Sequence, residues 1–161
     1  MKTRKLKKMN VCKEAILYVQ TQKSPAKAWN NCERGDWMLF IAQKLNVDDK
    51  KLTMAKAMIA KQAEHLMKDQ RSKDILQACF DYANGKITRE ELNIDAAGIF
   101  ADAALAAISA ANTTYGGTAA YAAYAVGADS NDSRIFSLKK SADICREYLT
   151  KEVLSNYRKL K

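Results

Sequence analysis

The chain has 161 residues, enough for one domain whose single hydrophobic core needs neither metal nor disulfide support. Its one proline and six glycines leave little material for the turns of a β-sandwich or barrel, and the prevalent alanine and leucine favour helices. We therefore predict an all-α fold, a single-domain bundle of about seven or eight helices with a central apolar helix and an Ala-rich helix.

Signals for helix starts appear early in the chain. Residues 1–9 form a basic arm that we expect to be flexible, and residues 10–161 form the predicted helical domain. Asn10 is the expected cap of a first helix that ends near residue 22. Ser24 followed by Pro25 predicts a second helix, because proline at the first helical position loses no hydrogen bond.

The third predicted helix covers residues 37–45, after the second has ended near Gly35. Asp36 is its expected cap, and its sequence WMLFIA is apolar almost all round, which is typical of a central helix. Asn46 or Asp48 precedes a fourth helix. Apolar residues recur along that helix at spacings of three and four and predict its buried face: Leu52, Ala55, Ile59, Ala63 and Leu66.

Capping patterns also start the next two helices. Asp69 opens a fifth helix, which buries Ile75, Leu76, Cys79 and Phe80 and stops at Gly85. Thr88 and Glu91 have the spacing of a reciprocal capping box, which predicts a sixth helix. The inner face of this sixth helix is expected to include Leu92, Ile99 and Leu105.

An alanine-rich run extends over residues 96–128. Asp102 is its only charged residue, but glycines at 116 and 117 and several polar residues interrupt it, so we do not expect a membrane span. Within the run, Tyr121 and Tyr124 fall on one helix face, where they form either a core ladder or the lining of a groove. The core is favoured, since aromatic residues are usually buried.

The final helix follows a polar loop over residues 129–133. Its predicted buried stripe consists of Leu138, Ala142, Cys145, Leu149 and Val153. The four cysteines have neither the spacing of a zinc site nor that of a disulfide framework, and they are expected to be buried apolar residues in a reducing cytoplasm. The sequence predicts no metal site, no cofactor and no catalytic grouping.

Eight charged or aromatic residues are candidates for binding a ligand or partner: Arg34, Asp36, Trp37, Arg71, Tyr121, Tyr124, Asp143 and Arg146. Arginine beside an aromatic ring can bind a flat anionic group, and a helix start near Arg34 would add backbone N–H donors. Asp143 and Arg146 are three residues apart, the spacing of a structural ion pair. The arginines therefore predict either structural ion pairs or a binding site.

Residues 28–39, AWNNCERGDWML, resemble a family of immunity proteins, the "immunity protein five-like" domain family. This family occurs in bacterial polymorphic-toxin systems and in phages and prophages. Further matches are Asp69-x-Arg71, residues 82–92, the run with Tyr121 and Tyr124, and the ADICR sequence at 142–146. The resemblance implies an α-helical protein without known catalysis, assigned by genome context to neutralising a toxin.

Two functional hypotheses follow. The first is a non-enzymatic, cytoplasmic immunity protein that binds an acidic toxin or effector directly. The second is a phage or bacterial counter-defence protein that sequesters an anionic small ligand such as a nucleotide signal. Converging arginines in a pocket would favour the second, and paired arginines on a convex surface the first. Nucleic-acid binding is less favoured because no recognition motif accompanies the charge, and self-association into a homo-oligomer is also expected.

Overall fold

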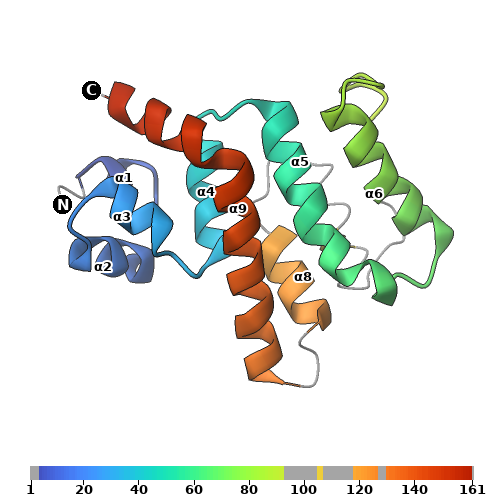
Figure 1. Ribbon diagram of the computed structural model, residues 1–161, viewed down its shortest axis with the longest axis horizontal. Helices are drawn as coiled ribbons and strands as arrows, with labels where there is room; N and C mark the ends of the chain where they lie inside the picture. The colour runs from blue at the N-terminus through green and yellow to red at the C-terminus, as the bar shows by residue number, and fades with distance from the viewer. Residues whose placement is uncertain (1–3, 93–104, 107–117, 127–129, 161) are drawn as a thin grey trace.

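The computed structural model describes residues 4–92, 105–106, 118–126 and 130–160, and these form eight α-helices, one 3-10 helix and no strand (Figure 1). The predicted all-α, single-domain helical bundle is confirmed. No helix among the described residues has the length and apolar character that crossing a membrane requires. The elements are α1 (Arg4–Lys8), α2 (Lys13–Thr21), α3 (Pro25–Asn30), α4 (Gly35–Lys44), α5 (Asp49–Ala60), η1 (Lys61–Leu66), α6 (Gln70–Ala83), α8 (Thr118–Val126) and α9 (Asn131–Lys159).

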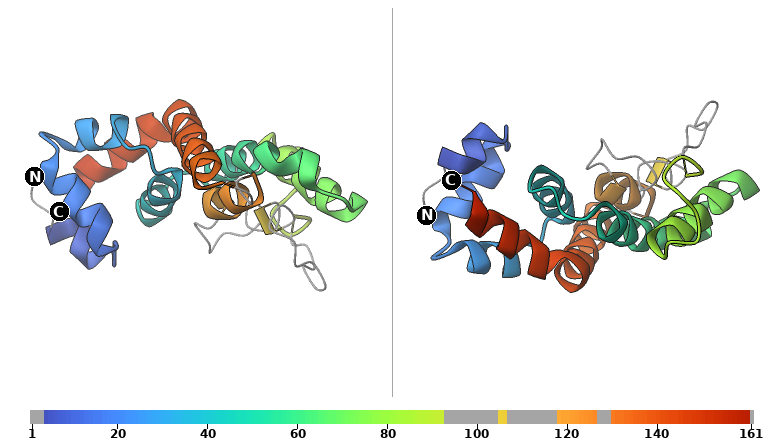
Figure 2. Two further views of the ribbon diagram at one scale, coloured as in Figure 1. Left: turned by 90° about the horizontal axis from the view of Figure 1, so that it is seen from below. Right: turned by 90° about the horizontal axis from the view of Figure 1, so that it is seen from above.

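Helix α9 is the axis of the fold, because α3, α4, α5 and α8 all pack against it. Helix α6 packs on α5 instead and lies on the far side of α5 from α9 (Figures 1 and 2). The small helices α1 to α3 gather around the C-terminal end of α9, so the two ends of the described chain lie close together (Figure 1). Lys5 Nζ links them by donating a hydrogen bond to the carbonyl of Leu160.

Small residues bring these helices into contact. Of the predicted α9 stripe, Ala142, Cys145, Leu149 and Val153 are buried, and Leu138 is partly buried. In α4, the central apolar helix, Met38, Leu39 and Ala42 are buried against this stripe. Helix α8 buries its alanines between α9 and α5, which fits the close axis approach that one-carbon side chains allow.

Most predicted caps are present. Ser24, Asp48 and Asp69 each accept a hydrogen bond from the backbone N–H three residues on. In the capping box, Thr88 N–H donates to Glu91 Oε2 over 2.6 Å, and Glu91 N–H donates to Thr88 Oγ1 over 3.2 Å. Most of the sixth predicted helix that follows, including Ile99, lies outside the described residues, as do the two glycines at 116 and 117.

Two predicted caps, Asn10 and Asp36, are wrong, and of the alternatives Asn46 and Asp48 the cap is Asp48. Asn10 and Asn46 have φ angles of 56° and 50°, the left-handed conformation that asparagine tolerates, and each turns the chain before the next helix. Helix α2 starts after Cys12 instead. Asp36 lies inside the first turn of α4, with Arg34 at the cap position.

Other boundaries also differ from the prediction. Helix α3 ends at Asn30, well before Gly35, and α9 starts at Asn131, inside the predicted loop. The fourth predicted helix changes to 3-10 winding at Lys61, and this tighter turn shifts the side-chain register, so Leu66 is exposed. The predicted arm contains helix α1, whose Leu6 is buried.

Candidate functional site

The junction between α3 and α4 packs on the middle of α9. Gly35 lies so close to α9 that a Cβ atom there would be 2.4 Å from Ser141 Cβ and 2.9 Å from the Ala142 nitrogen. Cys145 Sγ lies 3.8 Å from the Gly35 carbonyl oxygen as a hydrogen-bond donor. The Arg-Gly-Asp sequence is thus a point of close helix approach.

Arg34 and Asp36 form a two-point ion pair beside this contact. The Arg34 guanidinium donates to both Asp36 carboxylate oxygens, over 2.9 and 2.6 Å, and its carbon lies 4.5 Å from the centre of the Trp37 ring. The hydrogen bonds to Asp36 raise the pKa of Arg34 above its ordinary value. Asp36 lies in the first turn of α4, where its carboxylate pairs with Arg34 and its negative charge favours the helix N-terminus.

Arg146 reaches from α9 to the end of α3. It donates to the carbonyls of Asn30 and Cys32, over 3.2 and 2.6 Å, and to Asp143 over 2.6 Å. These bonds satisfy carbonyls that the end of a helix leaves without intrahelical partners. The predicted pair of Asp143 and Arg146 is therefore present, and its arginine also fixes α3 to α9.

Trp29 adds a further link between the two segments, since its indole N–H donates to Thr150 Oγ1 of α9 over 2.8 Å. The structure therefore brings together residues 28–39 and 142–146, the two segments on which the family resemblance chiefly rests. It also brings together five of the eight predicted site residues: Arg34, Asp36, Trp37, Asp143 and Arg146. Their contacts are those of a helix-packing joint.

Arg71 is elsewhere. It is exposed at the start of α6, a helix that packs on α5. The carboxylate of the neighbouring Asp69 caps this helix by accepting hydrogen bonds from the backbone N–H and the hydroxyl of Ser72, over 2.8 and 2.7 Å. The match at Asp69-x-Arg71 therefore includes a helix cap, and the three candidate arginines do not converge on one pocket.

The predicted burial of Tyr121 and Tyr124 is wrong. Both rings are exposed, because Ala119, Ala122 and Ala123 occupy the face of α8 that packs on its neighbours. The Arg134 guanidinium, from the first turn of α9, lies 5.0 Å from the centre of the Tyr124 ring. The two tyrosines are thus available on the surface.

The sequence reasoning missed two further exposed apolar residues, Ile135 and Phe136. Phe136 is 57% exposed, and Lys140 Nζ lies 4.6 Å from the centre of its ring. An apolar pair outside the regular α9 stripe was the available signal. We use "α8–α9 surface" for six residues on these two helices, of which Arg134 is half-buried and the others are exposed: Tyr121, Tyr124, Arg134, Ile135, Phe136 and Lys140. At 3.6 residues per turn, Arg134 and Phe136 point to different sides of α9, so this surface extends around the first turns of that helix.

Arg134 and Arg146 are twelve residues apart on α9, so a rise of 1.5 Å per residue separates them by about 18 Å along the axis. The part of the α8–α9 surface around Tyr124 and Arg134 is therefore separate from the helix-packing joint, while Lys140 lies between them, three residues before Asp143. The predicted site residues divide between these two places and the outlying Arg71.

A partly buried polar cluster, also missed, lies along α5. Asp49 pairs with Arg89 and accepts a 2.6 Å hydrogen bond from the Tyr82 hydroxyl. Lys56 on the same helix is only 1% exposed, and burial lowers its pKa from 10.5 to about 8. Residues far apart in the chain supply this cluster, so no local pattern marks it.

The cysteines behave as expected with one exception. Cys32, Cys79 and Cys145 are buried, and burial raises the pKa of each thiol, that of Cys79 to about 12. Cys12 is exposed, because it lies at the solvent-facing start of α2. Within the described part of the chain, no group of three or more histidine, cysteine or acidic residues could hold a metal ion.

Comparison with known proteins found no matching family model, no matching curated protein and no matching solved structure. The resemblance of residues 28–39 to the immunity-protein family therefore stays a prediction from the sequence. The evidence about function is the arrangement of side chains on this chain itself.

Proposed function

We propose that this chain is a non-enzymatic cytoplasmic binding protein, an immunity protein that neutralises a toxin or effector by direct contact. The observation that supports the proposal is the α8–α9 surface, where Tyr124 and Phe136 are 52% and 57% exposed and each has a cation over its ring. Aromatic residues and arginine are enriched where proteins bind each other and supply much of the binding energy.

The charge indicates the kind of partner. The net charge of +9 and the cations Arg134 and Lys140 on this surface favour an acidic toxin or effector. A complementary acidic face would speed association and select against basic partners. Apolar contact with the exposed rings would supply most of the affinity.

The alternative, sequestration of a nucleotide-like anion, has less support. Arg34 is bound to Asp36, and Arg146 is bound to Asp143 and two backbone carbonyls. Asp36 and Asp143 already neutralise these two guanidinium groups, so an anionic ligand would compete with a carboxylate at each of them. Calorimetry against a panel of nucleotides tests this alternative, and saturable heat for any of them would favour it over the immunity function.

The test of the immunity function is co-purification with the product of the neighbouring gene at micromolar concentration. Tyr124→Ala and Phe136→Ala should each weaken the complex at least tenfold if these rings are central to the interface. Leu17→Ala is the matched control, because Leu17 is 53% exposed but lies on α2, and it should bind like the wild type. Absence of a complex, or equal binding by all variants, would contradict the proposal.

Self-association is tested by the same variants. A homo-oligomer built on the α8–α9 surface would dissociate in Phe136→Ala but not in Leu17→Ala, which sedimentation velocity resolves. A wild-type monomer would leave the exposed rings available to a different protein. Dissociation in both variants would place the self-contact elsewhere.

A further inference from the structure

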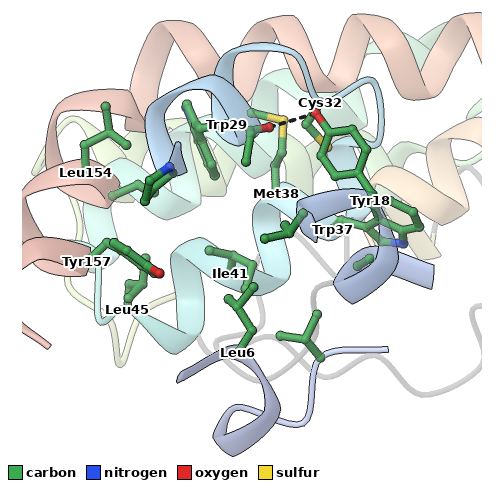
Figure 3. Close-up of a pocket in the computed structure, with 16 residues that line it drawn as sticks. Leu6, Tyr18, Trp29, Cys32, Trp37, Met38, Ile41, Leu45, Leu154 and Tyr157 are labelled. Carbon is green, nitrogen blue, oxygen red and sulfur yellow. Dashed lines mark hydrogen bonds between the residues drawn. The ribbon is translucent and has the colours of Figure 1, made fainter. Parts of the chain in front are cut away.

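A cavity of about 80 Å³ lies at the end of the bundle opposite the α8–α9 surface, open to solvent on one side (Figure 3). Helices α1 to α4 and the C-terminal part of α9 enclose it. The residues that define its shape are Leu6, Tyr18, Trp29, Trp37, Ile41 and Tyr157. The cavity shares Trp29, Cys32 and Trp37 with the joint described above but none of the residues of the α8–α9 surface.

The lining is almost entirely apolar, and two of its polar groups already have protein partners. The Tyr18 hydroxyl donates to the Ala28 carbonyl over 2.9 Å, and the Trp29 indole N–H donates to Thr150 Oγ1. Water in such a cavity would find few hydrogen-bond partners, and apolar cavities tend to stay dry and accept apolar ligands. The chemistry of the lining therefore favours hydrocarbon.

The volume limits the length of that hydrocarbon. One water-sized group needs roughly 10–15 Å³ of such space, so this cavity has room for about five to eight groups of that size. A methylene group is close to water in size. The cavity thus fits an alkyl chain of roughly five to eight carbons.

Cations lie beside the cavity on one side, on helix α1. Helix α1, which closes one side of it with Leu6, has the sequence RKLKK, and its Arg4, Lys7 and Lys8 are exposed. Lys5 Nζ lies 5.9 Å from the centre of the Tyr157 ring. Among the described residues, the ion pairs with a nitrogen–oxygen distance within 4 Å involve none of α1, so an anionic group there would not compete with a carboxylate.

We propose that this cavity binds a single-chain anionic amphiphile, a medium-chain carboxylate of about six to eight carbons. The alkyl chain occupies the apolar space between Trp29, Ile41 and Tyr157, and the carboxylate lies against the lysines of α1. This inference is independent of the immunity function, since the two use opposite ends of the bundle.

The two tryptophans of the chain, Trp29 and Trp37, both line the cavity, so tryptophan fluorescence reports on it selectively. Titration with 8-bromooctanoate, whose bromine quenches a nearby indole, should give saturable quenching. Octanoate should reverse the quenching, while butanoate and the uncharged 1-octanol should need at least tenfold higher concentrations. Absence of saturable quenching, or equal competition by all three compounds, would overturn the proposal.

Two kinds of variant test separately the cavity that holds the alkyl chain and the α1 lysines that contact the carboxylate. Ala15→Leu fills the cavity from α2 and should abolish quenching, and Ile41→Phe does the same from α4 if the first variant unfolds. Lys7→Glu with Lys8→Glu should weaken octanoate binding at least fivefold and leave 1-octanol binding unchanged. Lys73→Glu, an exposed lysine on the distant α6, is the charge-matched control. Unaltered quenching in both folded cavity-filling variants would place the ligand elsewhere and refute the site.

Discussion

Replacing Gly35 with alanine tests whether the joint between α4 and α9 is as close as the structure has it. The added Cβ would lie 2.4 Å from Ser141 Cβ and 2.8 and 2.9 Å from backbone atoms of Ser141 and Ala142. Ordinary contact begins near 3.4 Å, so α4 would have to move away from α9 by about 1 Å. Backbone atoms cannot rotate away, so the cost falls at the upper end for overpacked cores, about 3 kcal/mol.

The sign of the change in the free energy of unfolding distinguishes the close packing of Gly35 from its intrinsic helix propensity. Alanine is the better helix former by up to about 1 kcal/mol, so without the contact Gly35→Ala would stabilise the protein. Urea unfolding followed by far-ultraviolet circular dichroism measures the difference. Adding Ser141→Gly removes the shortest contact but keeps the two backbone ones, so the double variant should recover only part of the loss. A single variant as stable as the wild type would refute the close approach.

Three further substitutions test individual interactions. Lys56→Met removes a buried amine whose pKa of about 8 in the folded protein lies below its ordinary 10.5. The unfolded chain therefore binds the proton more tightly than the folded protein. Between pH 7 and 10, the free energy of unfolding of the wild type, measured with urea, should rise by about 2.5 kcal/mol relative to that of this variant. Parallel pH profiles of the two proteins would contradict the lowered pKa. Trp29→Phe removes the hydrogen bond to Thr150 and should cost about 1 kcal/mol; in a double-mutant cycle with Thr150→Val, a coupling of zero would count against that bond. Ser24→Ala removes the cap of α3 and should lower the free energy of unfolding by about 1 kcal/mol. Ser24→Asp should retain most of the wild-type stability. Equal melting temperatures for all three proteins would show that the cap contributes nothing.

Local patterns predicted much of the fold. The caps at Ser24, Asp48 and Asp69 were recognisable because donor and acceptor are only three residues apart. Asparagine is ambiguous in this respect, since it serves either as a cap or as a left-handed turn residue. At Asn10 and Asn46, the path of the following chain requires the left-handed turn conformation and not a cap.

The candidate site was less predictable, because spacing shows which residues share a helix face and not what that face meets. Tyr121 and Tyr124 were correctly placed on one face of a helix, yet the packing of α8 on α9 and α5 buried the alanine face instead. Arg146 finds its carbonyl partners 114 and 116 residues away, at Cys32 and Asn30. Only the folded chain brings these groups together.

The sequence by itself determined that this protein is a bundle of helices, because helix propensity, capping and three-four periodicity act over a few residues. It also supplied the basic charge and the arginine and aromatic candidates. The tertiary structure decided their roles: Arg146 fixes the end of α3 to α9, Arg34 pairs with Asp36 at the start of α4, and Tyr124 and Phe136 face solvent. The physical reason is that the burial and pairing of a side chain depend on residues distant in the chain. In this protein, those distant segments pack against α9.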